Sequence, residues 1–67
     1  MAVYKKIEIV GTSKTSFADA VKAAVAEAGK SIRHMSWFEV VEQRGSIKDG
    51  KVLEFQVTVR IGFKIEG

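Results

Sequence analysis

Residues 52–65 alternate between apolar and polar side chains with few faults, the pattern of a β-strand with one buried face. The apolar members of this alternation are Leu53, Phe55, Val57, Val59, Ile61, Phe63 and Ile65. Shortly before it stands Asp49-Gly50, a dipeptide that favours a two-residue type I′ turn. Residues 35–43, on the other side of the turn, also alternate like a strand. The second half of the chain is therefore predicted to be one long β-hairpin.

The first half of the chain is predicted to hold a strand and a helix. Residues 3–11, VYKKIEIVG, are rich in β-branched side chains and end at a glycine, which favours a strand. In the segment SFADAVKAAVAEAGKSI, Ser16 is suited to cap a helix N-terminus and Gly29 to end the helix in a left-handed conformation. Apolar residues recur there at helical spacing: Phe17, Ala20, Val21, Ala24, Val25 and Ala28. We expect one α+β domain over residues 1–67, with the order β-α-β-β and a three-stranded antiparallel sheet curled around one helix.

The turn also predicts which residues of the hairpin face one another. If Asp49 and Gly50 form the loop, the numbers of paired residues sum to about 99. This register pairs Trp37 with Gly62, Gln43 with Gln56, and Glu39 with Arg60, the last as a cross-strand ion pair. Arg44 then falls opposite Phe55, a poor match that suggests a β-bulge at Gly45.

The predicted outer face of the hairpin is too apolar for a small protein that stands alone. It carries Met35, Trp37, Val41, Gln43, Gln56 and Thr58. A chain of 67 residues without cysteine has a small core and no disulfide, so self-association is the expected support. Trp37, the only tryptophan, stands among carboxylates and amides. It is therefore expected to meet another subunit or a ligand, although a packing role is the simplest alternative.

Charge and motifs weaken several other function classes. The net charge is +3, but the basic residues are mostly scattered singly, which disfavours nucleic-acid binding. No apolar run approaches the roughly 20 residues that span a bilayer, and no export signal is recognisable, so a cytoplasmic protein is expected. No nucleophile-and-base or paired-carboxylate arrangement is present, so an enzyme is not expected. With one histidine and no cysteine, no metal site is expected either.

Four motifs together resemble those of the dodecins, small flavin-binding proteins with β-α-β-β subunits. They are YKKIEIVGTS at the start, HMSWFEV around Trp37, EQRGSI, and EFQVTVRIGFKIEG at the end, in compatible order over essentially the whole chain. The resemblance implies a hollow homododecamer with flavins bound in pairs at two-fold pockets between subunits. Ser36 departs from the acidic residue that many members carry just before the tryptophan, which puts contacts near the ring in doubt rather than the stacking.

The resemblance also implies roles for three residues. Trp37 would stack on the flavin ring, Gln56 would hydrogen-bond its pyrimidine edge, and Arg44 would lie near the phosphate of FMN. From the residues alone, Arg44 is as readily explained by a turn cap or by a pair with Glu42. The implied function is storage or buffering of FMN, or alternatively of riboflavin or FAD, with suppression of flavin photochemistry. The alternative is an oligomeric shell for another phosphorylated ligand, such as a coenzyme A-like nucleotide.

Overall fold

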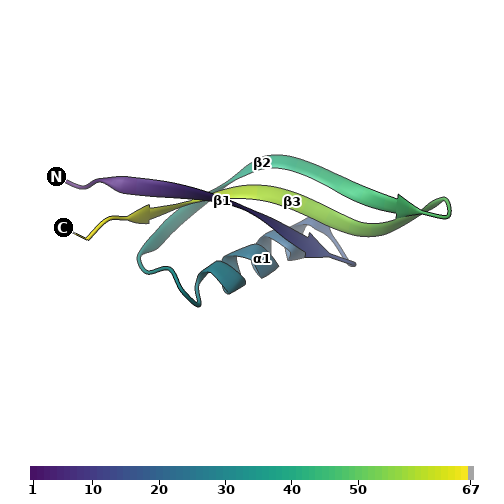
Figure 1. The fold of residues 1–67 in the computed structure, drawn as a ribbon, viewed down its shortest axis with the longest axis horizontal. Helices are drawn as coiled ribbons and strands as arrows, with labels where there is room; N and C mark the ends of the chain where they lie inside the picture. Colours follow the sequence, from purple (N-terminus) through teal and green to yellow (C-terminus); the bar gives the residue numbers. More distant parts are fainter. Residues whose placement is uncertain (67) are drawn as a thin grey trace.

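The computed structural model describes residues 1–66 and has the predicted order of elements. They are β1 (Tyr4–Ser13), α1 (Phe17–Ala28), β2 (Met35–Lys48) and β3 (Lys51–Lys64). The three strands form one antiparallel sheet in the order β1-β3-β2, and α1 covers one of its faces (Figure 1). The α+β fold is confirmed, and the central strand is β3.

The helix begins as the sequence predicts but ends differently. The Ser16 hydroxyl oxygen accepts a hydrogen bond of 3.0 Å from the backbone N–H of Asp19. Gly29 has φ −64°, so the left-handed cap predicted there is wrong. The chain instead continues in helix-like turns, and the backbone N–H of Ile32 donates to the carbonyl of Ala28 at 3.0 Å. The left-handed residue comes later, at His34 (φ 62°), where the chain turns into β2.

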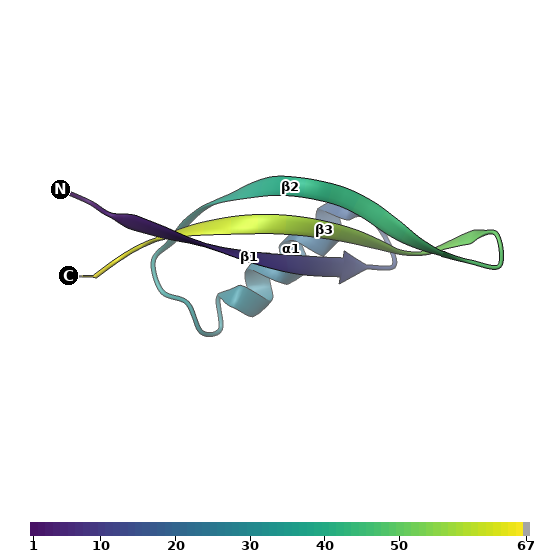
Figure 2. The same ribbon diagram turned by 45° about the horizontal axis from the view of Figure 1, so that its top comes forward.

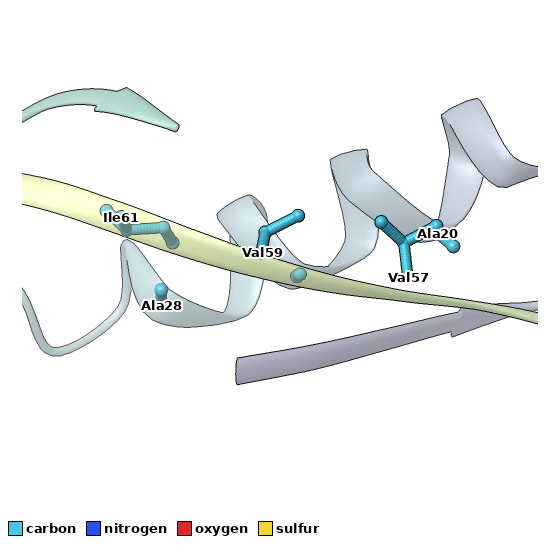
Figure 3. Close-up of a cluster of buried hydrophobic side chains, with 6 residues drawn as sticks. Ala20, Ala28, Val57, Val59 and Ile61 are labelled. Carbon is cyan, nitrogen blue, oxygen red and sulfur yellow. The ribbon is translucent and has the colours of Figure 1, made fainter. Parts of the chain in front are cut away.

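The core is a stripe of alanines packed on the central strand. Its buried members are Ala20, Ala24, Ala28, Val57, Val59 and Ile61 (Figure 3). The alanines recur every fourth residue, so they lie on one side of α1 and let its backbone approach the sheet closely. Gly11 permits the same approach on β1, because a Cβ built there would lie 2.1 Å from the Ala20 carbonyl oxygen. Small side chains on both elements therefore set the distance between helix and sheet.

Three irregularities in the pairing of β2 with β3 change the predicted register. Trp37 faces Gly62 as predicted, but the pairs from Glu42 to Ser46 are displaced by one residue, between the shift that follows Val40 and the one that follows Ser46. Arg44 therefore lies opposite Gln56, and the predicted pairing of Gln43 with Gln56 is wrong. The bulge expected at Gly45 is also absent from the pairing, since Gly45 stands opposite Phe55, and the nearby shift lies between Ser46 and Ile47.

The irregularity between Met35 and Trp37 moves one residue to the other face of the sheet. Met35 packs against the core, and its terminal methyl would lie 3.2 Å from a Cβ at Gly29. Placing Met35 on the outer face beside Trp37 was therefore wrong. Alternation assigns faces correctly only while no residue is inserted into the strand.

Within residues 1–66, the end of the hairpin and a groove beside α1 are apolar surfaces that the chain itself leaves uncovered. The end of the hairpin extends past β1 and α1 (Figures 1 and 2), and it exposes Ile47, Val52 and Leu53. A groove of about 530 Å³ runs between α1 and β2, lined by Ala18, Val21, Lys22, Val25, Ala26 and Phe38. The radius of gyration is 13.8 Å, whereas a compact chain of this length has about 11 Å. The elongated shape leaves surface for neighbouring chains to cover.

Two glycine substitutions test this packing. Gly11→Ala places a methyl group against the backbone of α1, and overpacking of this kind destabilises a core by about 1–3 kcal/mol. Gly29→Ala is the control, because its right-handed φ suits alanine and its nearest contact is the flexible end of Met35. Urea unfolding at equal protein concentration should show a lowered free energy of unfolding for Gly11→Ala alone. A clearly destabilised Gly29→Ala would instead favour the left-handed cap.

Candidate functional site

The face of the sheet turned away from α1 carries the predicted site residues. Val57, Val59 and Ile61 of β3 point toward the helix, so the even-numbered residues between and beside them point outward. Trp37 and Gly62 lie at the end of this outer face nearest the chain termini, while Arg44 and Gln56 lie toward the hairpin turn. Between the two groups stands Arg60, flanked by Glu8 on β1 and Glu39 on β2.

The indole of Trp37 lies directly over Gly62. A Cβ at Gly62 would be 2.2 Å from indole atoms Cε2 and Cζ2, so only glycine leaves room for the ring in this position. The ring of Tyr4 on β1 lies beside the indole, with ring centroids 5.1 Å apart and planes inclined by 55°. The tryptophan nevertheless stays 39% exposed. The sheet thus presents a partly open aromatic surface held in place by β3.

Glu39 links Trp37 to the first strand. Its carboxylate accepts a 3.4 Å hydrogen bond from the Trp37 Nε1–H and forms an ion pair of 2.5 Å with the Lys6 ammonium. The hydrogen bond from Lys6, and after it the one from Trp37, hold the pKa of Glu39 below its ordinary value. The predicted ion pair of Glu39 with Arg60 is wrong, although the two residues face each other. Arg60 donates to Glu8 on β1 instead, at 2.9 Å, while Glu39 pairs with Lys6.

Arg44 and Gln56 meet in a second polar cluster. The Arg44 Nε–H donates to Gln56 Oε1 at 2.9 Å, and Nη1 donates to Glu42 at 2.6 Å and to the Thr58 hydroxyl at 3.0 Å. The pair of Arg44 with Glu42, one of the alternatives from the sequence, is therefore present. The amide nitrogen of Gln56 in turn donates to Glu54 at 3.0 Å.

Tyr4 and Glu54 are contacts of the site that the sequence reasoning missed. Glu54 stands two residues before Gln56 on β3, so the period of two alone indicates that the side chains share a face. Tyr4 had no comparable signal, because its approach to Trp37 depends on β1 pairing with β3 in a particular register.

Trp37 and Gln56 of one chain lie far apart. Trp37 sits over Gly62, which is six residues from Gln56 along β3. At the rise of a β-strand that interval is about 20 Å. No flat three-ring ligand is long enough to stack on Trp37 and reach Gln56 of the same chain. The structure brings Arg44 and Gln56 together but not Trp37 and Gln56.

Comparison with known proteins agrees with the motifs and the fold. The family model described as Dodecin matches residues 3–66. The chain belongs to the dodecin family. A dodecin from Thermus thermophilus is 50% identical over 64 residues, 96% of this chain and 93% of the relative. The solved structure of dodecin from Streptomyces coelicolor superposes with a TM-score of 0.95 at 41% identity, covering 98% of this chain and 94% of that one.

One dodecin relative carries a metal in its name. Calcium dodecin from Mycobacterium tuberculosis is 32% identical over 65 residues, 97% of this chain and 92% of the relative. Within residues 1–66 of the present chain, no three histidine, cysteine or acidic side chains gather as they do around a bound metal.

No helix in this part of the chain is long and apolar enough to cross a membrane. Dodecins are small binding and storage proteins rather than enzymes.

The position of the indole can be tested through its own fluorescence. Gly62→Ala places a methyl group within the volume that the indole occupies, so the ring must leave the backbone of β3. Because Trp37 is the only tryptophan, its emission reports this change directly. We expect a red-shifted emission maximum and stronger quenching by acrylamide, with Gly29→Ala as an unshifted control. An unchanged spectrum would show that the indole does not rest on Gly62.

Proposed function

We propose that this dodecin binds and stores flavins and suppresses their photochemistry. Flavin binding is a general property of the family. The observation that carries the proposal is the partly exposed indole of Trp37, which lies flat enough against Gly62 to exclude even a methyl group there. Stacking of aromatic rings contributes about 0.5–1.5 kcal/mol beyond the burial of area, and the flavin ring system offers a large flat partner. FMN is the proposed ligand, with riboflavin and FAD as alternatives.

The binding pocket is proposed to form between chains. Since Trp37 and Gln56 of one chain are about 20 Å apart along β3, a ring that touches both needs Trp37 from one chain and Gln56 from another. The exposed hairpin end and the apolar groove beside α1 support such an association, because neither surface is covered by the chain itself. We propose the hollow homododecamer of the family as the assembly.

The polar residues suit the two ends of a flavin nucleotide. The pyrimidine edge presents an N–H between two carbonyl oxygens, and the amide of Gln56 supplies both an acceptor and donors. Arg44 has a second amino group, Nη2, beyond the atoms that contact Gln56, Glu42 and Thr58. A guanidinium donates well to phosphate oxygens, so Nη2 is the proposed contact for FMN.

Suppression of photochemistry is assigned to Trp37. An indole in contact with the ring is the nearest electron donor, and rapid electron transfer from it returns excited flavin to the ground state. In the paired arrangement one ring face meets the indole and the other meets the second flavin, which leaves no face for a substrate. The proposal is therefore storage without turnover.

Substitution of Trp37 and Gln56 should separate affinity from quenching. Trp37→Ala removes stacking and indole area worth roughly 2–4 kcal/mol, so affinity for FMN should fall by about two orders of magnitude. Any flavin that still binds should fluoresce more strongly. Gln56→Ala removes hydrogen bonds worth about 1–3 kcal/mol, but its residual complexes should stay dark. Titration of the apo-protein, with emission of the bound state recorded, measures both effects.

The parent protein serves as the control for both variants. If Trp37→Ala binds FMN as the parent does and still quenches it, Trp37 serves only to join subunits. If the parent is colourless and ignores added flavin, the coenzyme A-like alternative is favoured instead.

The assembly and its filling give a second test. We expect light scattering to show a dodecamer, because a chain with three alanines among its six buried apolar residues has too little core to leave its other apolar surfaces in water. Saturation with FMN should occur at one flavin per chain. A stable folded monomer, or saturation well below this ratio, would argue against paired pockets between chains.

A further inference from the structure

The amide of Gln56 is held by two residues of its own chain. Arg44 Nε donates to its oxygen at 2.9 Å, and its nitrogen donates to Glu54 at 3.0 Å. Arg44 reaches it from β2, where it stands directly opposite Gln56, and Glu54 lies on the same side of β3. Both polar atoms of the amide are therefore hydrogen-bonded within the chain.

These two neighbours allow only one orientation of the amide. A guanidinium has donors only, so it must face the oxygen, and an ionised carboxylate has acceptors only, so it must face the nitrogen. Rotation of the amide by half a turn would place N–H groups against Arg44 and the oxygen against Glu54, and both contacts would become repulsive. The usual ambiguity of a glutamine amide is thus removed by chemistry.

The arginine is itself anchored. Its Nη1 donates to Glu42 and to the hydroxyl of Thr58, and Thr58 is only 7% exposed. These two acceptors, one on β2 and one on β3, therefore hold the guanidinium before any ligand arrives. An amide oriented in advance loses less conformational entropy on binding than a freely rotating one.

We infer that Glu54 and Arg44 are positioning residues that orient the Gln56 amide for the ring edge of the ligand. The amide oxygen has two lone pairs and the nitrogen two hydrogens, and the chain uses one of each. One acceptor site and one N–H remain, which matches a carbonyl and the adjacent N–H on the pyrimidine edge. The inference rests on the proposed flavin function and adds Glu54 to the residues that govern it.

Arg44 acquires a role here that does not depend on phosphate. Its Nε and Nη1 serve Gln56 and the anchor, whereas Nη2 is the group proposed for FMN. A ligand without phosphate, such as riboflavin, must then also lose affinity when the contact of Arg44 with Gln56 is removed. Comparison of riboflavin with FMN separates the two roles of this one side chain.

The test is a double-mutant cycle between positions 54 and 56, read by titration of the assembled apo-protein with riboflavin and with FMN. Glu54→Ala should weaken both ligands by a similar factor, about three- to tenfold. Glu54→Gln keeps an acceptor oxygen for the Gln56 nitrogen and should restore most of the affinity. In a Gln56→Ala background, Glu54→Ala should have no further effect, because no amide remains to be oriented.

Light scattering will show whether Glu54→Ala still assembles. A second variant, Arg44→Lys, tests the same inference if it does not. Arg44→Lys keeps the positive charge but not the fork, and it too should weaken riboflavin as well as FMN. The inference is overturned if Glu54→Ala binds both flavins as tightly as the parent does. It is also overturned if Glu54→Ala lowers flavin affinity by the same factor in the Gln56→Ala background as in the parent. A loss with Arg44→Lys for FMN alone would also overturn it. A parent that binds neither flavin overturns the proposed function itself.

Discussion

The length of the helix relative to the sheet is the constraint from which the rest of the structure follows. At the rise of an α-helix, the 12 residues of α1 span about 18 Å. The 14 residues of β3 span about 46 Å. One helix therefore covers less than half of the central strand, and the hairpin end has no cover of its own. The alanines pack closely on Val57, Val59 and Ile61 and stabilise the covered part of the sheet. A single chain cannot bury the apolar surface at the end of the hairpin.

The sequence predicted those features that depend on local chemistry. Both turn residues, Asp49 and Gly50, have positive φ, as the Asp-Gly dipeptide favours, and Ser16 caps the helix. The pairing of Trp37 with Gly62 was also predicted correctly, because the two register shifts between the turn and Trp37 are opposite and cancel. The predictions that were wrong concern features that depend on contacts between distant segments or on small differences in backbone energy. The partner of Glu39 is Lys6 because β1 lies beside β3, a neighbour that the hairpin alone does not reveal.

The β-bulges explain the remaining errors about the site. A single inserted residue reverses the face of all that follow it, so the period of two gave the right face for Trp37 and the wrong one for Met35. It also placed Gln43 rather than Arg44 opposite Gln56. The consequence is chemical as well as geometric. With an amide opposite, Gln56 would have faced a group able to donate or accept, whereas Arg44 can only donate and so fixes the direction of the amide.

Under the proposed function, the separation of Trp37 from Gln56 would couple flavin binding to subunit association. If one ring must contact residues from two chains, each bound flavin adds contacts across a subunit boundary, and binding and association stabilise each other by mass action. The outer face is suited to this coupling. Its charged groups largely satisfy one another within the chain, Lys6 with Glu39, Arg60 with Glu8 and Arg44 with Glu42. The ring of Trp37 is instead left partly open. A neighbouring chain that approaches this face therefore meets charges that are already paired and contribute little to binding. The largest favourable contribution would come from burying the indole against a flat ligand.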